Sequence, residues 1–195
     1  MCAEWNRVFV VGGGANVPPT PPDLPEDTLI ISADSGAGTL RHWQLQPHWI
    51  VGDMDSIREE DYVYWKHRGV AFRTFPAEKD ATDMELAIDY AWKEGIRTFL
   101  MTGAWGGRMD HSLGNVELMY ALARKGATVR LLTDNGYAEA TDASWQDELP
   151  KGRSVSLLPL TPQVRGVTTI GLKYPLSKAD LVRGTTLGIS NESLG

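Results

Sequence analysis

The sequence predicts an α/β fold in which a mostly parallel sheet covered by helices is followed by a small antiparallel β domain. Two observations lead to this prediction. Through the first two thirds of the chain, short runs of β-branched and aromatic residues alternate with segments of helical character, as in sheets with helical crossovers. After Leu132, short apolar runs follow the turn signal Asn135-Gly136 without intervening helices. We therefore expect one domain over residues 1–135 and a second over residues 136–195.

Individual elements follow from local patterns. The predicted strands of the first domain are residues 8–11, 29–31, 49–51, 70–72, 98–101 and 128–132, and those of the second are residues 155–158 and 164–170. The clearest helix begins at Thr82, because Thr82 and Glu85 form a capping box that satisfies backbone N–H groups, and it ends at Gly95. Two further helices are expected over residues 59–68 and 112–125. Prolines crowd residues 18–25, which predicts an extended surface loop.

Composition and charge disfavour several classes of protein. The 195 residues include 25 Asp and Glu against 19 Lys and Arg, and the net charge of −6 has the wrong sign for a nucleic-acid binder. No apolar run approaches the roughly 18 residues that span a bilayer, and residues 1–7 are not followed by a signal-peptide core. Cys2 is the only cysteine, which fits a reducing compartment. We expect a cytoplasmic protein without a nucleic-acid or membrane partner.

Glycines and acidic residues gather where the predicted strands end. Four clusters follow the first, second, third and fifth strands: residues 12–14, 34–36, 52–55 and 103–110. Glycine and aspartate are also common turn formers, so any single cluster could be a turn. Because ligands bind outside the carboxyl ends of strands in open α/β sheets, four clusters at one edge predict a ligand site.

The third of these strand ends carries two carboxylates suited to a metal. Asp53 and Asp55 lie two residues apart, and in extended backbone both would face one cation. Oxygen ligands at this density suit Mg²⁺, which takes its remaining ligands from water and substrate phosphates. The alternative is a turn in which Asp55 and Ser56 cap the next helix.

Two further segments suit a phosphate chain. Lys79, Asp80 and Asp83 surround the start of the helix capped by Thr82, where N–H groups and Lys79 would attract polyphosphate and an acid would hold the cation. In the second segment, Gly106-Gly107-Arg108-Met109-Asp110-His111, the glycines allow close backbone approach and Arg108 can clamp phosphate oxygens. His111 more often packs or caps than catalyses, and no Cys/His cluster suggests zinc.

Sequence blocks along nearly the whole chain resemble those of one enzyme family. In order, they are Ala33-Asp34-Ser35-Gly36, Gly52-Asp53-Met54-Asp55-Ser56, Lys79-Asp80-Ala81-Thr82-Asp83-Met84-Glu85, Gly106-Gly107-Arg108-Met109-Asp110-His111, Gly171-Leu172-Lys173-Tyr174-Pro175-Leu176 and Gly188-Ile189-Ser190-Asn191-Glu192. This order is similar to that of the thiamine pyrophosphokinase family. The resemblance implies a Rossmann-like α/β domain, a β-sandwich domain that binds thiamine and dimerises, and a homodimer with shared active sites. It also implies transfer of the pyrophosphoryl group of ATP to thiamine, with release of AMP.

The resemblance also implies roles for individual residues. It implies Mg²⁺ as cofactor with Asp53, Asp55 and Asp83 as ligands, and these three with Arg108 as catalytic residues. The remaining implied contacts are with ATP or its phosphates for Gly13, Lys79, Thr82, Gly107, Arg108 and Asp110, and with thiamine for Asp34, Ser190 and Asn191.

Departures from the family and rival functions complete the sequence-based picture. The first block of the family commonly has glycine and asparagine where this chain has Ser35 and Gly38, and relatives usually continue into further strands beyond Glu192. Gly38 cannot supply the side chain that the family commonly has at this position, and the sequence leaves open whether the C-terminal sheet is incomplete or the chain is truncated. Two other functions stay open: a metal-dependent glycosyl- or nucleotidyltransferase with a D-x-D motif, and a non-catalytic module that senses nucleotide or thiamine.

Overall fold

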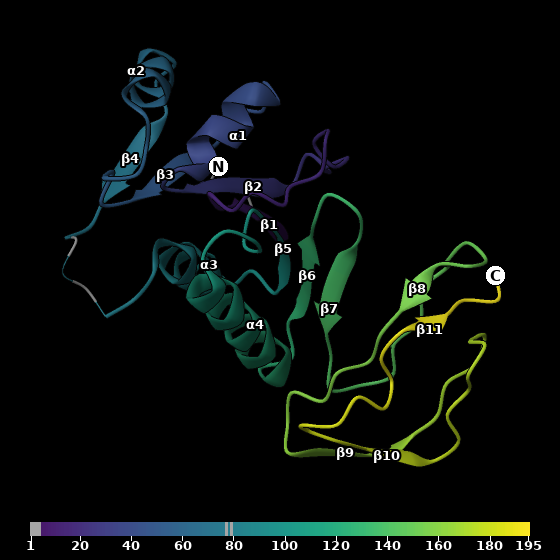
Figure 1. Ribbon diagram of the computed structural model, residues 1–195. Coiled ribbons are helices and arrows are strands. Elements are labelled where there is room, and N and C mark those ends of the chain that lie inside the picture. The colour runs from purple at the N-terminus through teal and green to yellow at the C-terminus, as the bar shows by residue number, and fades with distance from the viewer. Residues whose placement is uncertain (1–4, 77, 79) are drawn as a thin grey trace. The chain divides into compact units, whose positions relative to one another are not determined.

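A computed structural model describes residues 5–76, 78 and 80–195 of the chain (Figure 1). The chain divides into two compact units between Asp142 and Ala143. Within the described residues, none of the helices has both the length and the apolar character needed to cross a bilayer.

The first unit is built on a seven-stranded sheet in the order β4-β3-β2-β1-β5-β6-β7. All neighbouring strands are parallel except β6 and β7. The predicted strands are present, and the mostly parallel sheet is confirmed. Their bounds are β1 (Arg7–Val11), β2 (Thr28–Ala33), β3 (Trp49–Gly52), β4 (Ala71–Thr74), β5 (Thr98–Thr102), β6 (Thr128–Leu132) and β7 (Tyr137–Ala140).

Helices cover both faces of this sheet. The α1 (Gly36–His42) and α2 (Glu59–His67) helices pack on one face, and α3 (Asp83–Lys93) and α4 (Met109–Arg124) pack on the other (Figure 1). Strand β1 contributes side chains to the hydrophobic cores on both faces of the sheet, because alternate side chains of a strand point to opposite faces. Phe9 and Val11 lie in the core under α1 and α2, whereas Val8 and Val10 lie in the core under α3 and α4. Burial on both faces explains why the central strands have continuous apolar runs.

The helix ends show which predictions local sequence can support. Thr82 caps α3 as predicted, with its Oγ1 accepting the Glu85 N–H at 3.2 Å. Helix α4 begins at Met109, earlier than the predicted residue 112. Helix α1 was not predicted, since its first turn contains Gly36 and no side chain caps it. Its position depends on tertiary packing, because a Cβ at Gly36 would lie 2.0 Å from the Val11 carbonyl oxygen.

Strand β7 differs from the sequence-based expectation, which placed residues after 135 in the second domain. The turn at Asn135-Gly136 joins two strands of the first sheet, and the Thr133 N–H donates to the Gly136 carbonyl at 2.9 Å. Strand β7 pairs antiparallel with β6, and Arg130 and Glu139 form an ion pair across this pairing at 2.8 Å. These contacts are the reason that the first unit extends to Asp142.

The second unit consists of two antiparallel strand pairs. Strand β8 (Ser154–Val155) pairs with β11 (Asn191–Glu192), and β9 (Gln163–Val167) pairs with β10 (Ala179–Val182). The predicted small antiparallel β domain is therefore confirmed. Among its described residues, Leu181 is the one large apolar side chain that is buried.

Candidate functional site

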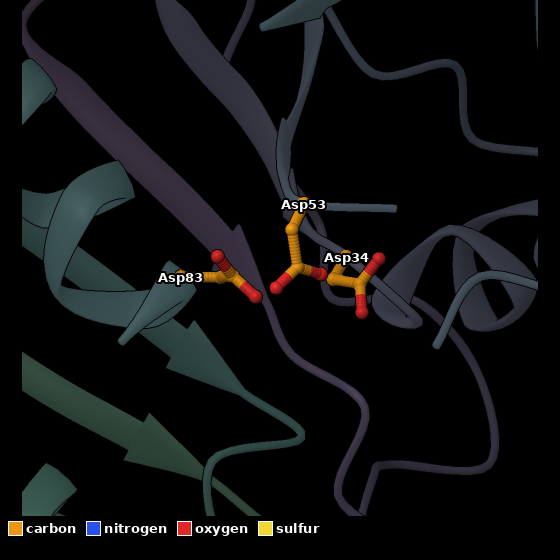
Figure 2. Close-up of side chains that lie close together, drawn as sticks. All are labelled: Asp34, Asp53 and Asp83. Atoms are coloured by element: carbon orange, nitrogen blue, oxygen red, sulfur yellow. The ribbon is translucent and has the colours of Figure 1, made fainter. Parts of the chain in front are cut away.

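Three aspartates from separate segments meet at the carboxyl edge of the sheet. Asp34 follows β2, Asp53 follows β3, and Asp83 is the first residue of α3. One carboxylate oxygen of each lies within 4.8 Å of one oxygen of each of the others, and Figure 2 shows Asp53 between Asp34 and Asp83. Neighbouring parallel strands end at the same edge, which brings Asp34 and Asp53 together, and the N-terminus of α3 adds Asp83.

Gly52 makes this close approach possible. Its φ of +153° is one that side-chain-bearing residues rarely adopt. A Cβ at this position would lie 3.0 Å from the Asp34 Cβ and 3.2 Å from the Asp83 Cγ. Glycine directly before Asp53 is therefore needed for packing among the carboxylates as well as for the turn.

Asp34 is the most constrained member of the group. Its backbone has a positive φ of 43°, and its Oδ2 accepts the Ser56 N–H at 3.2 Å. Its Oδ1 is buried and has no hydrogen-bond partner among the described residues. Burial raises the pKa of Asp34, the Ser56 hydrogen bonds oppose this effect, and the charges of Asp83 and Asp53 raise the pKa further. Clustered carboxylates with an unused buried oxygen fit a divalent cation with oxygen ligands.

Asp55 lies outside this group. The prediction that Asp53 and Asp55 face one side assumed an extended backbone, but Met54 has a φ of 68° and the chain turns. The Asp53 Oδ1 accepts the Asp55 N–H at 3.1 Å, and the exposed Asp55 carboxylate accepts the Ser56 hydroxyl at 2.7 Å. The turn that sequence reasoning left as an alternative is therefore present. A role for Asp55 as a ligand stays a prediction.

Arg108 lies at the N-terminal end of α4, after the glycine-rich loop that follows β5. Its guanidinium engages Asp110 through two contacts, Nη2 to Oδ2 at 2.6 Å and Nε to Oδ1 at 3.2 Å. This contact lowers the pKa of Asp110. Both side chains are exposed, so the guanidinium is accessible to a ligand that competes with Asp110. Gly106 and Gly107 have φ values of 90° and 76°, which explains the need for glycine.

Two residues that sequence reasoning missed hold this loop in shape. The Ser112 hydroxyl accepts the Gly106 N–H at 3.1 Å and donates to the Arg108 carbonyl at 3.0 Å. The buried Asn115 amide donates to the Ala104 carbonyl at 2.7 Å. The sequence did contain a signal for this role, because Ser112 and Asn115 are polar residues three positions apart on the buried face of α4.

The first glycine cluster packs against the same loop. The Gly14 N–H donates to the Gly103 carbonyl at 2.7 Å, and a Cβ at Gly14 would lie 2.6 Å from that oxygen. A Cβ at Gly13 would lie 1.9 Å from the Ser35 Oγ. These glycines allow three loops to pack tightly, and an ATP contact from Gly13 stays a prediction. Lys79 lies outside the described residues.

The predicted thiamine residues of the second unit occupy two different environments. Ser190 is exposed and has a φ of 58°. The Asn191 amide is buried, donating to the Tyr174 carbonyl at 2.7 Å and accepting the Tyr174 N–H at 3.0 Å and the Glu192 N–H at 2.9 Å. The structure thus gives Asn191 a role in holding the Tyr174 backbone beside β11.

Comparison with known proteins assigns both units to one family. Residues 24–131 match the thiamin pyrophosphokinase catalytic domain, and residues 144–195 match the thiamin pyrophosphokinase vitamin B1 binding domain. The chain belongs to the thiamine pyrophosphokinase family.

Individual relatives agree with this assignment. The chain is 33% identical over 187 residues to thiamine pyrophosphokinase of Bacillus subtilis, covering 94% of this chain and 87% of the relative. It is 30% identical over 162 residues to thiamine pyrophosphokinase 2 of Arabidopsis thaliana, covering 76% of this chain and 59% of that relative. The crystal structure of the Bacillus subtilis protein superposes with a TM-score of 0.85 at 30% identity, covering 97% of this chain and 90% of the other.

The residues singled out by the sequence fall in both matched segments. Asp34, Asp53, Asp83 and Arg108 lie within the residues matched to the thiamine pyrophosphokinase catalytic domain. Ser190 and Asn191 lie within the residues matched to the vitamin B1 binding domain. The predicted family membership is confirmed.

Proposed function

We propose that this chain transfers the pyrophosphoryl group of ATP to the hydroxyl of thiamine, giving thiamine diphosphate and AMP. The observation that carries the proposal is the group formed by Asp34, Asp53 and Asp83 within the segment matched to the family's catalytic domain. A triphosphate carries several negative charges and would bind to these carboxylates through a shared divalent cation. The carboxyl edge of a parallel sheet is also where ligands bind in open α/β folds.

We further propose that Asp53 and Asp83 bind Mg²⁺ together with a third carboxylate. Asp34 is one candidate, because it belongs to the group of three, and Asp55 is the other, because the family blocks imply it. When bound, Mg²⁺ neutralises negative charge on the phosphate oxygens. Separate Asp34→Asn and Asp55→Asn variants decide between the candidates, since only loss of a ligand abolishes Mg²⁺-dependent stabilisation of the protein.

The chain's own residues position the reacting groups. Arg108 leaves Asp110 and offers its planar fork to phosphate oxygens. The thiamine hydroxyl oxygen bonds to the β-phosphorus, the bond from that phosphorus to the bridging α-oxygen breaks, and AMP departs with this oxygen. We assign the hydroxyl proton to Asp34, which belongs to the carboxylate group and whose buried Oδ1 has no hydrogen-bond partner among the described residues, rather than to the exposed Asp110.

A homodimer with shared active sites is also part of the proposal. Nine large apolar side chains of the second unit are exposed, which supports burial of this surface against another subunit. They are Trp145, Leu158, Val164, Ile170, Tyr174, Val182, Leu187, Ile189 and Leu194. In this proposal, phosphate-binding residues of one subunit face the thiamine-binding segment at Ser190 of its partner.

Mixing two inactive variants tests the shared site. Asp53→Asn disables the phosphate side, and Ser190→Trp blocks the thiamine side while leaving the pairing of Asn191 with Tyr174 in place. A random mixture should recover about a quarter of wild-type activity, because half of the dimers are mixed and one of their two sites is intact. A verified mixed dimer without activity would contradict shared sites, and a fully active monomer would contradict the dimer.

The assay that tests the function follows AMP with ATP, Mg²⁺ and thiamine. AMP formation that depends on thiamine supports the proposal, whereas ADP formation or no reaction would remove it. Sugar-nucleotide turnover in place of this reaction would favour the glycosyl- or nucleotidyltransferase. We also propose a cytoplasmic location, because the reaction consumes ATP and Cys2 has no second cysteine in the chain with which to form a disulfide.

A further inference from the structure

The hairpin turn that joins β6 and β7 contains a chemically reactive pair of residues. Asn135 directly precedes Gly136, and of the five asparagines in the sequence it alone is followed by glycine. The side-chain amide of an asparagine can react with the backbone nitrogen of the next residue, and a glycine there has no Cβ to block the approach. The fold uses this pair as a turn, and neither residue belongs to the carboxylate group.

The other asparagines are less suited to this reaction. Asn115 and Asn191 are buried, and the side-chain amide of each donates to a backbone carbonyl at 2.7 Å. Asn135 is exposed at the tip of the hairpin. The two remaining asparagines are followed by residues with a bulky side chain, Asn6 by Arg7 and Asn16 by Val17.

The nitrogen of Gly136 is not held by the turn. In a hairpin with a two-residue loop, the residues on either side of the loop can exchange two backbone hydrogen bonds. The Thr133 N–H donates to the Gly136 carbonyl at 2.9 Å, but within the part of the chain that the structure describes the Gly136 N–H makes no return bond to Thr133. Attack by this nitrogen therefore breaks no hydrogen bond of the turn.

The Thr133 hydroxyl lies beside the amide that would be attacked. Its Oγ1 is 3.4 Å from the Asn135 Oδ1 and 3.1 Å from the Gly136 carbonyl oxygen, and it can donate to either. When it donates to Oδ1, it stabilises the negative charge that develops on this oxygen as a nucleophile adds to Cγ. The turn thus combines an exposed amide, an unhindered nitrogen and a donor for the developing charge.

We propose that Asn135 is a site of spontaneous deamidation and isoaspartate formation in the folded protein. The Gly136 nitrogen loses its proton to hydroxide and bonds to the Asn135 Cγ, the bond from Cγ to the amide nitrogen breaks, and ammonia leaves with a proton from water. Water then opens the cyclic imide. Cleavage of the new bond to Cγ leaves an aspartate, whereas cleavage of the original peptide bond leaves an isoaspartate whose main chain runs through Cβ and Cγ.

An isoaspartate at this position disrupts the pairing of β6 and β7. It lengthens the main chain by one carbon within a two-residue loop, which disturbs the register that sets Leu132 opposite Tyr137. Two contacts of Arg130 depend on this register, the ion pair with Glu139 at 2.8 Å and the guanidinium stacked 4.3 Å from the Tyr137 ring centroid. Strand β7 lies at the edge of the described sheet and pairs there with β6. The modification therefore destabilises β7.

Peptide mapping of the wild-type protein after incubation at mildly alkaline pH tests the proposal. We expect the peptide that contains Asn135 to gain the mass difference between a hydroxyl and an amino group, and part of this product to accept a methyl group from an isoaspartyl methyltransferase. The peptide that contains Asn16 is the internal control and should keep its mass. Gly136→Ala should slow the mass gain about tenfold, because a Cβ crowds the attacking nitrogen.

Thermal unfolding separates the effect of the main chain from that of the added charge. The purified isoaspartate form should melt about 4 °C below wild type, whereas Asn135→Asp, which has the charge with a normal main chain, should melt within about 2 °C of wild type. Equal melting temperatures for these two proteins would overturn the loss of β6–β7 pairing.

Two results of the mapping would overturn the reaction itself. A folded chain that keeps the Asn135 amide while the urea-unfolded chain loses it would show that the native turn prevents the reaction. Equal rates of mass gain in wild type and Gly136→Ala would show that the Gly136 nitrogen is not the nucleophile.

Discussion

Replacing Asp53 by Asn should change the stability of the protein in opposite directions with and without Mg²⁺. Asn keeps the Oδ1 that accepts the Asp55 N–H, so the turn after β3 is preserved. Without a cation, Asp53 repels the carboxylates of Asp34 and Asp83, which lie within 4.8 Å. At an effective dielectric constant of about 20, two unit charges 4.8 Å apart repel each other by about 3.5 kcal/mol. Because Asp53 is partly exposed, we take about 1 kcal/mol as the net gain from its removal.

Bound Mg²⁺ reverses this balance. At a Mg²⁺ concentration about a hundredfold above its dissociation constant, the wild-type protein gains about 2.7 kcal/mol of unfolding free energy. For a chain of this length, each kcal/mol shifts Tm by about 2–4 °C. The variant should therefore melt about 3 °C above wild type in EDTA and several degrees below it in saturating Mg²⁺.

Scanning calorimetry in EDTA and in Mg²⁺ measures both shifts, and the exposed Glu59→Gln variant outside the carboxylate group is the control. The same Asp53→Asn protein should lose nearly all turnover. Equal Tm values in EDTA would show that repulsion within the group is negligible. Two results would show that Asp53 only forms a turn. One is a rise in Tm on adding Mg²⁺ equal to that of wild type, and the other is activity within about threefold of wild type, which is roughly 0.7 kcal/mol of activation free energy.

Three further outcomes are expected. Arg108→Lys keeps the positive charge but loses the planar guanidinium, so kcat/KM for ATP should fall about tenfold. Steady-state rates equal to those of wild type would show that Arg108 acts only through its charge. Gly52→Ala adds a Cβ 3.0 Å from the Asp34 Cβ at a residue with positive φ. Urea unfolding should therefore show an unfolding free energy lower by about 2–4 kcal/mol and no stabilisation on adding Mg²⁺. Wild-type stability together with wild-type stabilisation by Mg²⁺ would refute the packing argument. Burial lowers the pKa of His48, whose Nδ1 accepts the Ile30 N–H. As the pH falls below about 6.5, the unfolded state therefore binds a proton at His48 before the folded state does. The wild-type protein should lose unfolding free energy as the pH falls below this value. His48→Asn should lack this part of the pH dependence in urea titrations at neutral and mildly acidic pH, and identical profiles for the two proteins would contradict it.

The sequence alone determined the layers of the first unit and the edge at which its functional residues gather. Continuous apolar runs in β1 and β2 require burial on both faces, which in a chain with intervening helices means a parallel sheet. Thr82 and Glu85 fixed the start of α3 because capping depends on residues only three positions apart. The acidic residues after β2 and β3 had to share one edge, since parallel strands end on the same side.

Tertiary structure alone decided which carboxylates meet and which segments complete the sheet. Asp34 joined Asp53 and Asp83 in place of Asp55, because the positive φ of Met54 turns the chain before Asp55. Helix α1 formed on glycines with no capping side chain, held by packing against β1, and β7 paired with β6 although the turn before it resembled a domain boundary. These outcomes depend on contacts between residues distant in the chain. Local propensity carries no information about such contacts, because their free energy arises only when the segments are brought together.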